Sequence, residues 1–358
     1  MSNKRALRCL IAAGGTAGHV LPALAVAESL TRRDVDVQFA GSPERIEARL
    51  VAQAGYEFHA LHTSGIPRRP SWSAVRSIGG AVQAPVKAAR ILRATRPDVV
   101  MGGGGYVGGP MVMAARMLGI PAAFTEADAH LGLANRLAAP FAQAGFLAYP
   151  VAGRSGSKYR VVGRPIPQRS VASLDRREAR RRFGLPEEGD VVLIVGGSLG
   201  ARALNRAVVD TFGRDGPPVL HLCGERDYAE LTPLLARDDY RLIAFTDEFG
   251  AALRACDLVV SRSGGVVWEI AAAGVPALLI PYPHATADHQ YKNAVHFAGS
   301  GAAHVVRESE LQLGEQVARL LADKERLSEM GAAMLRLARP DAADDVAKGL
   351  ILLGSVGE

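Results

Sequence analysis

A short glycine-rich loop with the pattern Gly-Gly-hydroxyl-x-Gly occurs twice in this chain. Residues 14–18 follow the apolar run 9–13, and residues 196–200 follow the apolar run 191–195. A strand, a tight glycine turn and a helix N-terminus form an anion site, because backbone N–H groups and the helix dipole both favour negative charge there. Two such units predict two Rossmann-like domains that face each other across a cleft.

The length and the strand pattern support two α/β domains. At 358 residues the chain is too long for one ordinary core. Apolar runs alternate with helical patterns, which predicts parallel sheets with helices on both faces. The stiff segment 163–167 marks the boundary, so we predict domains 1–163 and 164–340, with a final helix 341–358 packing back on the first.

The expected elements follow from hydrophobic periodicity and from proline positions. The expected strands are residues 9–13, 35–40, 98–101, 122–125, 159–162, 191–195, 219–222, 242–245, 258–261 and 277–280. The expected helices are residues 22–32, 81–95, 201–212, 268–273 and 290–298.

Composition indicates a globular protein without a membrane span. Apolar residues make up 48% of the chain, and no apolar run approaches the 18 residues that a span needs. Residues 4–13 resemble a signal peptide, but the apolar run is short and turns directly into the glycine loop, so we interpret it as the first strand. The cysteines Cys9, Cys223 and Cys256 are odd in number and lack metal-type spacing, which favours a reduced cytoplasmic protein.

Positive charge is concentrated in the first domain. Residues 1–163 hold 19 Lys and Arg against 9 Asp and Glu, whereas the remainder is mildly acidic. Residues 64–97 contain seven basic residues, no acidic one and several large apolar ones. This pattern fits a solvated helix face, or a surface where apolar side chains enter anionic lipid and basic ones meet headgroups. Binding to nucleic acid is less favoured, because the segment has few aromatic side chains that could stack on bases.

Three further features are candidates for function. His19 ends the first loop and is either an ordinary helix-start histidine or a general base at the carboxyl edge of the sheet. A glycine cluster, 102–109, suggests close backbone approach to a ligand. Glu269, in the first turn of a helix, either compensates the dipole or accepts sugar hydroxyls. We interpret residues 284–290 as a polar substrate-contacting loop rather than a metal site.

Taken together, these motifs resemble those of the MurG family, the N-acetylglucosaminyltransferases that make the bacterial cell-wall lipid precursor. The matching segments run in family order over almost the whole chain, and the set is far more specific than any one piece. They are residues 14–20, 22–25, 104–107, 109–110, 196–201, 262–265, 269–276, 289–290 and 293–294.

The resemblance implies a B-type glycosyltransferase fold and a defined reaction. GlcNAc would pass from UDP-GlcNAc to the C4 hydroxyl of MurNAc in undecaprenyl-pyrophosphoryl-MurNAc-pentapeptide, with inversion. Negative charge would develop on the departing diphosphate, which a helix N-terminus can stabilise without a metal or other cofactor. His19 would be the base, and Glu126 is a second candidate for base or orienter.

The resemblance also assigns residues to the two substrates. Ser198 and its loop would meet the donor diphosphate, Glu269 would hold ribose hydroxyls, and Gln290 would bind GlcNAc. Thr246 would contact uracil through its backbone, and the first glycine loop would border the acceptor diphosphate. The implied substrate-binding set is Thr16, Ala17, Gly18, Tyr106, Asp128, Arg164, Ser198, Leu199, Gly200, Thr246, Gly264, Gly265, Val266, Glu269 and Gln290.

The sequence departs from the family pattern at three places. Residues 125–128 read Thr-Glu-Ala-Asp, so Asp128 stands where the family often has a sugar-contacting Asn. The hinge motif Asn-Pro-x-Arg becomes Arg-Pro-Ile-Pro, so Arg164 or Arg169 would have to substitute. The loop after Arg262 is one residue shorter than in many relatives.

We expect a peripheral enzyme on the cytoplasmic face of the cell membrane, with an anionic membrane surface and the cell-wall synthesis and division machinery as partners, and no nucleic acid. The rival functions are a related transferase with another lipid or natural-product acceptor, a nucleotide-sugar epimerase, and a nucleotide-sugar-binding regulator. The expected membrane contacts are Arg68, Arg69, Trp72, Arg76 and Lys87.

Overall fold

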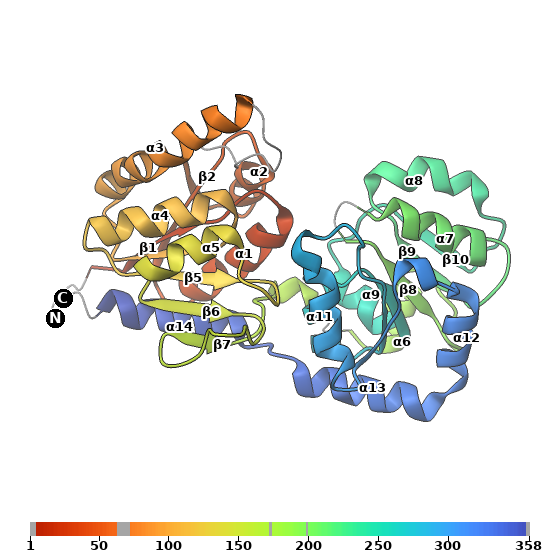
Figure 1. Ribbon diagram of the computed structural model, residues 1–358. Helices are drawn as coiled ribbons and strands as arrows, with labels where there is room; N and C mark the ends of the chain where they lie inside the picture. Colours follow the sequence, from red (N-terminus) through yellow and green to blue (C-terminus); the bar gives the residue numbers. More distant parts are fainter. Residues whose placement is uncertain (1–4, 63–71, 172–173, 198–199, 356–358) are drawn as a thin grey trace. The chain divides into compact units, whose positions relative to one another are not determined.

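The computed structural model describes the backbone of residues 5–62, 72–171, 174–197 and 200–355, and their side chains except at 72–82 and 169. Two compact units emerge, Met1–Pro167 together with Pro340–Glu358, and Gln168–Arg339. Each unit is a parallel β-sheet flanked by helices (Figure 1). The predicted α/β fold class is therefore confirmed.

In the described part of the first unit, seven parallel strands form one sheet in the order β3-β2-β1-β4-β5-β6-β7. The strands are β1 (Arg8–Ala12), β2 (Asp36–Gly41), β3 (Glu57–Ala60), β4 (Val99–Gly102), β5 (Ala122–Glu126), β6 (Ala144–Leu147) and β7 (Tyr159–Val161). The helices are α1 (Ala17–Thr31), α2 (Ile46–Gln53), α3 (Trp72–Thr95), α4 (Gly105–Met117), α5 (Leu133–Ala138) and α14 (Ala342–Ser355), with a short 3-10 helix η1 (Ala139–Phe141).

The central strand β1 shows why its sequence is apolar without alternation. Cys9 and Ile11 pack into a hydrophobic core with α1, α2 and α14. Leu10 packs into the core on the other face of the sheet, with α3, α4 and α5. Both faces of a parallel strand are covered by crossover helices, so the buried positions of β1 after Arg8 are all apolar. Figure 1 shows α3, α4 and α5 running side by side over one face of this sheet.

The second unit repeats this architecture with six parallel strands among its described residues, in the order β10-β9-β8-β11-β12-β13. The strands are β8 (Val192–Val195), β9 (Val219–Leu222), β10 (Tyr240–Ile243), β11 (Leu258–Ser261), β12 (Ala277–Leu279) and β13 (Ala303–Val305). The helices are α6 (Arg176–Arg182), α7 (Arg202–Phe212), α8 (Glu225–Leu231), α9 (Phe249–Ala255), α10 (Val267–Ala273), α11 (His289–Ala298), α12 (Leu313–Ala322) and α13 (Lys324–Leu337).

The strand order places the glycine motifs where the order of each sheet reverses. In the first unit the order reverses between β1 and β4, and in the second between β8 and β11. Open α/β sheets bind ligands at such switch points, beyond the carboxyl ends of the strands. The two glycine loops follow β1 and β8, and the turn 263–265 follows β11. Each unit therefore presents its predicted motifs at its own switch point.

The structure corrects several predicted boundaries. Helix α1 begins at Ala17 rather than at residue 22, because Thr16 already serves as its N-cap and Pro22 lies inside the helix. Strand β10 begins two residues before the predicted strand. The first unit continues to Pro167, because Arg164 contacts the first unit.

Candidate active site

The first glycine loop brings Thr16 and His19 together at the start of α1. Gly15 has a φ of +93°, a backbone conformation that favours glycine. Thr16 then adopts an extended conformation as the N-cap, and its Oγ1 lies 3.2 Å from Nδ1 of His19. The imidazole therefore sits in the first helical turn, at the carboxyl edge of the sheet, as predicted.

Pro22 leaves a helix carbonyl available to Arg164. A residue at position 22 would normally donate its N–H to the carbonyl of Gly18, but proline has no N–H. The nearly buried Arg164 instead donates from Nη2 to that carbonyl at 2.6 Å. Its Nη1 also lies 3.5 Å from the carbonyl oxygen of Ala127. Arg164, predicted to bind substrate, thus joins α1 to the segment after β5.

Glu126 is held by its own loop. Its Oε1 accepts the N–H of Ala127 at 3.0 Å, and its Oε2 accepts the N–H of Gly132 at 2.9 Å and Nδ2 of Asn135 at 3.0 Å. Burial raises the pKa of the Glu126 carboxyl, whereas these N–H donors act in the opposite direction. With both oxygens engaged, the geometry favours an orienting role for Glu126 over that of a proton acceptor.

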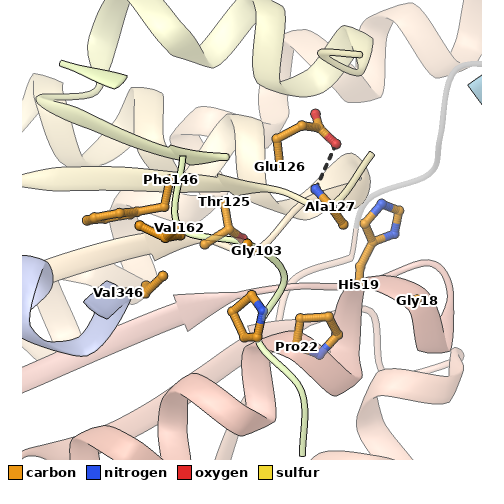
Figure 2. A pocket seen from close by; sticks show the side chains of 12 residues that line it. Gly18, His19, Pro22, Gly103, Thr125, Glu126, Ala127, Phe146, Val162 and Val346 are labelled. Carbon is orange, nitrogen blue, oxygen red and sulfur yellow. Dashed lines mark hydrogen bonds between the residues drawn. The ribbon is translucent and has the colours of Figure 1, made fainter. Parts of the chain in front are cut away.

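A small hollow gathers the catalytic candidates of the first unit (Figure 2). Gly18, His19 and Glu126 line it, and its wall is completed by apolar side chains such as Phe146 and Val346. Figure 2 shows the Glu126 side chain bonded to the backbone of Ala127. Asp128, which donates its N–H to Glu126 Oε1 at 3.3 Å, follows in the same loop.

Most of the glycine cluster 102–109 forms the start of α4, and several of its glycines are closely packed within the protein. A Cβ on Gly103 would lie 2.7 Å from the Cβ of Ala13, and one on Gly104 would lie 2.6 Å from the His19 ring. Tyr106, predicted to bind substrate, packs its ring 3.1 Å from the Cβ position of Gly15.

The second unit places Gly264 beside Gln290. A Cβ on Gly264 would lie 3.9 Å from Nε2 of Gln290, whose Oε1 accepts the N–H of Tyr282 at 2.9 Å. Gly265 and Val266 lead into α10, where their carbonyls accept the first helical N–H groups. The predicted neighbours of the donor sugar are therefore close together.

Glu269 has a partner that sequence reasoning missed. It lies in the first turn of α10, and its Oε1 accepts a hydrogen bond from the Oγ of the buried Ser170. Ser170 stands almost a hundred residues earlier, in the short 3-10 helix η2 (Gln168–Ser170), so no local pattern indicated the pair. The serine fixes the orientation of the carboxylate.

The described ends of the second glycine loop are Gly197 and Gly200, both with positive φ. Gly200 packs so closely on the carbonyl of Cys223 that a Cβ would clash with it. Ser198 and Leu199 lie outside the described residues. Thr246 accepts the N–H of Glu248 through its Oγ1 at 3.0 Å and so orders the turn before α9.

Among the described residues, the structure contains no group of three or more His, Cys, Asp or Glu side chains placed to hold a metal ion. In the segment 284–290, Asp288 has a left-handed conformation and pairs with Arg307 at 3.6 Å. The predicted loop is partly helical, because Thr286–Asp288 form a short 3-10 helix and α11 begins at His289.

The predicted membrane contacts are only partly within the described structure. Arg68 and Arg69 lie outside it, and for Trp72 and Arg76 only the backbone in α3 is described. Lys87 donates from Nζ to the carbonyl of His62 at 3.3 Å. Of the helices in the described part of the chain, none combines the length and apolar character that crossing a bilayer requires.

Comparison with known proteins agrees with this architecture. Residues 9–146 match the glycosyltransferase family 28 N-terminal domain, and residues 191–346 match the glycosyltransferase family 28 C-terminal domain. Two parallel-sheet units with these matches define a glycosyltransferase with the B-type fold.

Relatives that match over nearly their full length identify the family within this class of glycosyltransferases. The UDP-N-acetylglucosamine--N-acetylmuramyl-(pentapeptide) pyrophosphoryl-undecaprenol N-acetylglucosamine transferase of Salinibacter ruber is 37% identical over 98% of this chain and 97% of its own. That of Halorhodospira halophila is 41% identical over 94% and 96%. The crystal structure of Acinetobacter baumannii MurG matches with a TM-score of 0.77 and 29% identity, over 97% of this chain and 99% of that one. The chain belongs to the MurG family.

Proposed function

We propose that this protein transfers GlcNAc from UDP-GlcNAc to the C4 hydroxyl of MurNAc in undecaprenyl-pyrophosphoryl-MurNAc-pentapeptide, with inversion, as a step of peptidoglycan synthesis. The observation that carries the proposal is the likeness to enzymes named for this transfer, at 37% identity over nearly the full length of both chains. The glycine loops at both switch points fit a reaction in which two diphosphate-bearing substrates meet.

In the proposed mechanism His19 is the general base. The C4 hydroxyl attacks the anomeric carbon of GlcNAc, its proton passes to the imidazole, and the bond from the anomeric carbon to the UDP oxygen breaks. Thr16, 3.2 Å from Nδ1, orients the ring. General-base catalysis usually contributes about 100-fold or more, which sets the scale for its removal.

The acceptor sugar is proposed to bind around His19 and the loop after β5. Asp128 accepts from a sugar hydroxyl, and Glu126 holds the loop that carries it through four N–H donors. Arg164 positions this loop and the first turn of α1 together, through the carbonyls of Ala127 and Gly18. Thr16, Ala17 and Gly18 border the acceptor diphosphate.

The donor is proposed to bind the second unit. The loop of Ser198, Leu199 and Gly200 leads into α7, whose N-terminus stabilises the charge that develops on UDP. Glu269, oriented by Ser170, accepts the ribose hydroxyls, and Gln290 beside Gly264 binds GlcNAc.

We also propose peripheral attachment to anionic membrane on the cytoplasmic side. Basic side chains of α3 are supplemented by exposed apolar ones on the neighbouring α4, α5 and η1, where Arg116 and Arg136 are also exposed. Burial of such apolar side chains among lipid headgroups, with nearby Arg on the phosphates, gives reversible binding. The exposed apolar residues on these three elements are Met117, Leu133, Leu137 and Phe141, and Val86 is exposed on α3 itself.

The proposal is tested by transfer of radiolabelled GlcNAc from UDP-GlcNAc to a short-chain analogue of the lipid acceptor. We expect transfer by the wild type and a fall in kcat of about 100-fold or more for His19→Ala. A mild effect would move the role of base to Glu126 or Asp128. Binding of UDP-GlcNAc without transfer would refute the acceptor, and epimer formed without acceptor would indicate an epimerase.

A further inference from the structure

A fully buried carboxyl group lies beneath the first glycine loop. Glu47, in the first turn of α2, has no exposed surface. Its Oε2 accepts the N–H of Gly15 at 3.1 Å, and its Oε1 accepts the N–H of Ser42 at 3.2 Å. A buried carboxyl group is tolerated where N–H donors satisfy its oxygens. Glu47 therefore ties the loop after β1 to the segment after β2.

A glycine of the loop and a glycine at the end of β2 make room for this side chain. A Cβ on Gly14 would clash with Oε1 of Glu47, and a Cβ on Gly41 would lie 2.8 Å from its Cγ. On the other side of the loop, a Cβ on Gly105 would clash with the carbonyl of Gly14. The loop is therefore packed closely between α2 and the start of α4.

The two glycine loops differ at the same structural position. Gly15 and Gly197 share a φ of +93°, but α1 begins at Ala17, directly after the N-cap Thr16, whereas α7 begins only at Arg202. At Gly15 the N–H is taken by Glu47 and the Tyr106 ring packs alongside. At Gly197, considering only the described residues, no heavy atom lies within 4 Å of the corresponding Cβ position. Among the described residues, the Tyr106 ring therefore lies against the Cβ position of Gly15, whereas the corresponding position at Gly197 is open.

We propose that Glu47 is a positioning residue for the transfer step, an inference that rests on the proposed function. By holding the N–H of Gly15, Glu47 fixes the residue directly before Thr16, the N-cap of α1. Thr16 and His19 are then set relative to the acceptor hydroxyl. Misplacing a reacting group by about 1 Å can cost about 100-fold in rate. The first loop acts as a rigid support for the base.

The test is Glu47→Gln, with Glu44→Gln as its matched control. Glutamine keeps the size, but its NH₂ group cannot accept an N–H, so Gly15 or Ser42 loses its acceptor. Glu44 lies in the same segment, is exposed, and bonds Ser42 Oγ without contacting Gly15. We expect kcat of Glu47→Gln to fall at least about tenfold with the KM for UDP-GlcNAc within about twofold of wild type, and Glu44→Gln to match wild type.

A second readout separates positioning from general destabilisation. Histidine-labelled protein gives an NMR signal of His19, identified by its loss in His19→Gln, and we expect this signal to shift in Glu47→Gln and not in Glu44→Gln. Should Glu47→Gln fail to fold, Glu47→Asp keeps the charge but is one methylene too short, and the same split between kcat and KM is expected. A change in kcat of less than twofold, or an equal rise in the KM for UDP-GlcNAc, would overturn the inference. A wild type without transfer would instead refute the proposed function.

Discussion

A buried histidine in the second unit makes its stability depend on pH. His221 in β9 has no exposed surface; Tyr240 Oη lies 2.7 Å from its Nδ1 and Asn205 Oδ1 lies 3.1 Å from its Nε2. Asn205 donates from Nδ2 to the Cys223 carbonyl and to Asp227, so its Oδ1 is the acceptor and His221 Nε2 carries the proton. The imidazole is therefore neutral, with the Tyr240 hydroxyl donating to Nδ1.

The magnitude follows from proton linkage. Burial lowers the pKa of His221 to about 3, opposed in part by Asp227, whereas an unfolded histidine titrates near its ordinary value of about 6.5. Between these values the unfolded chain binds a proton that the folded unit does not, so stability falls as the pH falls. The loss is about 1.4 kcal/mol from pH 7.5 to 5.5 and about 2.6 kcal/mol from pH 7.5 to 4.5.

The assay is urea unfolding followed by tryptophan fluorescence. Replacing Trp72 by Phe leaves Trp268, which is buried in the second unit, as the probe, because the chain has 2 Trp. The free energy of unfolding is measured at pH 7.5 and 5.5 for this background and for His221→Gln. We expect the difference in the free energy of unfolding between pH 7.5 and pH 5.5 to be about 1.4 kcal/mol smaller in His221→Gln, whatever the stability of the variant at pH 7.5.

Two results bear on the reasoning. The exposed His284 of the same unit provides the comparison variant, His284→Gln, which shows how far replacing another histidine by glutamine changes the measurement. Asp227, whose pKa is held at about 2 chiefly by Arg226, loses its contribution only at lower pH and so lies outside the window. Equal pH dependence in wild type and His221→Gln would refute a neutral buried imidazole.

Two further predictions concern the donor and the membrane. Ser170→Ala removes the hydrogen bond to Glu269 and should raise the KM for UDP-GlcNAc about three- to tenfold with kcat nearly unchanged; an unchanged KM in steady-state assays would contradict the orienting role. Leu137→Glu on α5 should weaken binding to anionic vesicles at least about tenfold in a flotation assay, because burying a leucine contributes about 1.5–3 kcal/mol. Leu352→Glu, equally exposed on α14, is the control, and an equal loss there would exclude a localised contact.

The regular elements of the fold could be predicted where apolar runs are continuous. Strands β9 and β11 have the predicted bounds, because parallel strands covered on both faces are mostly apolar, with His221 and Ser261 as the polar exceptions. Helix α4 was not predicted, because its glycines, such as Gly105 and Gly108, indicate a loop locally. Close tertiary packing explains these glycines, since a Cβ on Gly105 would clash with the carbonyl of Gly14 and one on Gly108 would lie 3.3 Å from the carbonyl oxygen of Ala12.

The sequence predicted the motifs of the site but not the distant residues that hold their side chains in place. His19, Gly264 and Glu269 belong to motifs that are continuous in sequence. Their partners come from distant segments, as Ser170 does for Glu269. Glu47 is typical of a helix first turn, where a carboxylate usually compensates the dipole, so only its burial revealed the contact with the glycine loop.

The last helix has a consequence for how the protein is made. Helix α14 packs on α1 through buried residues such as Val346 and Leu350, and Asp344 pairs with Arg33 at 3.1 Å. The first unit is therefore completed by residues that leave the ribosome after the entire second unit. Its core stays open to solvent until α14 has been synthesised, while the continuous second unit can fold first. Nascent chains lacking the final helix should expose the apolar face of α1, the helix that carries His19, and be prone to aggregation.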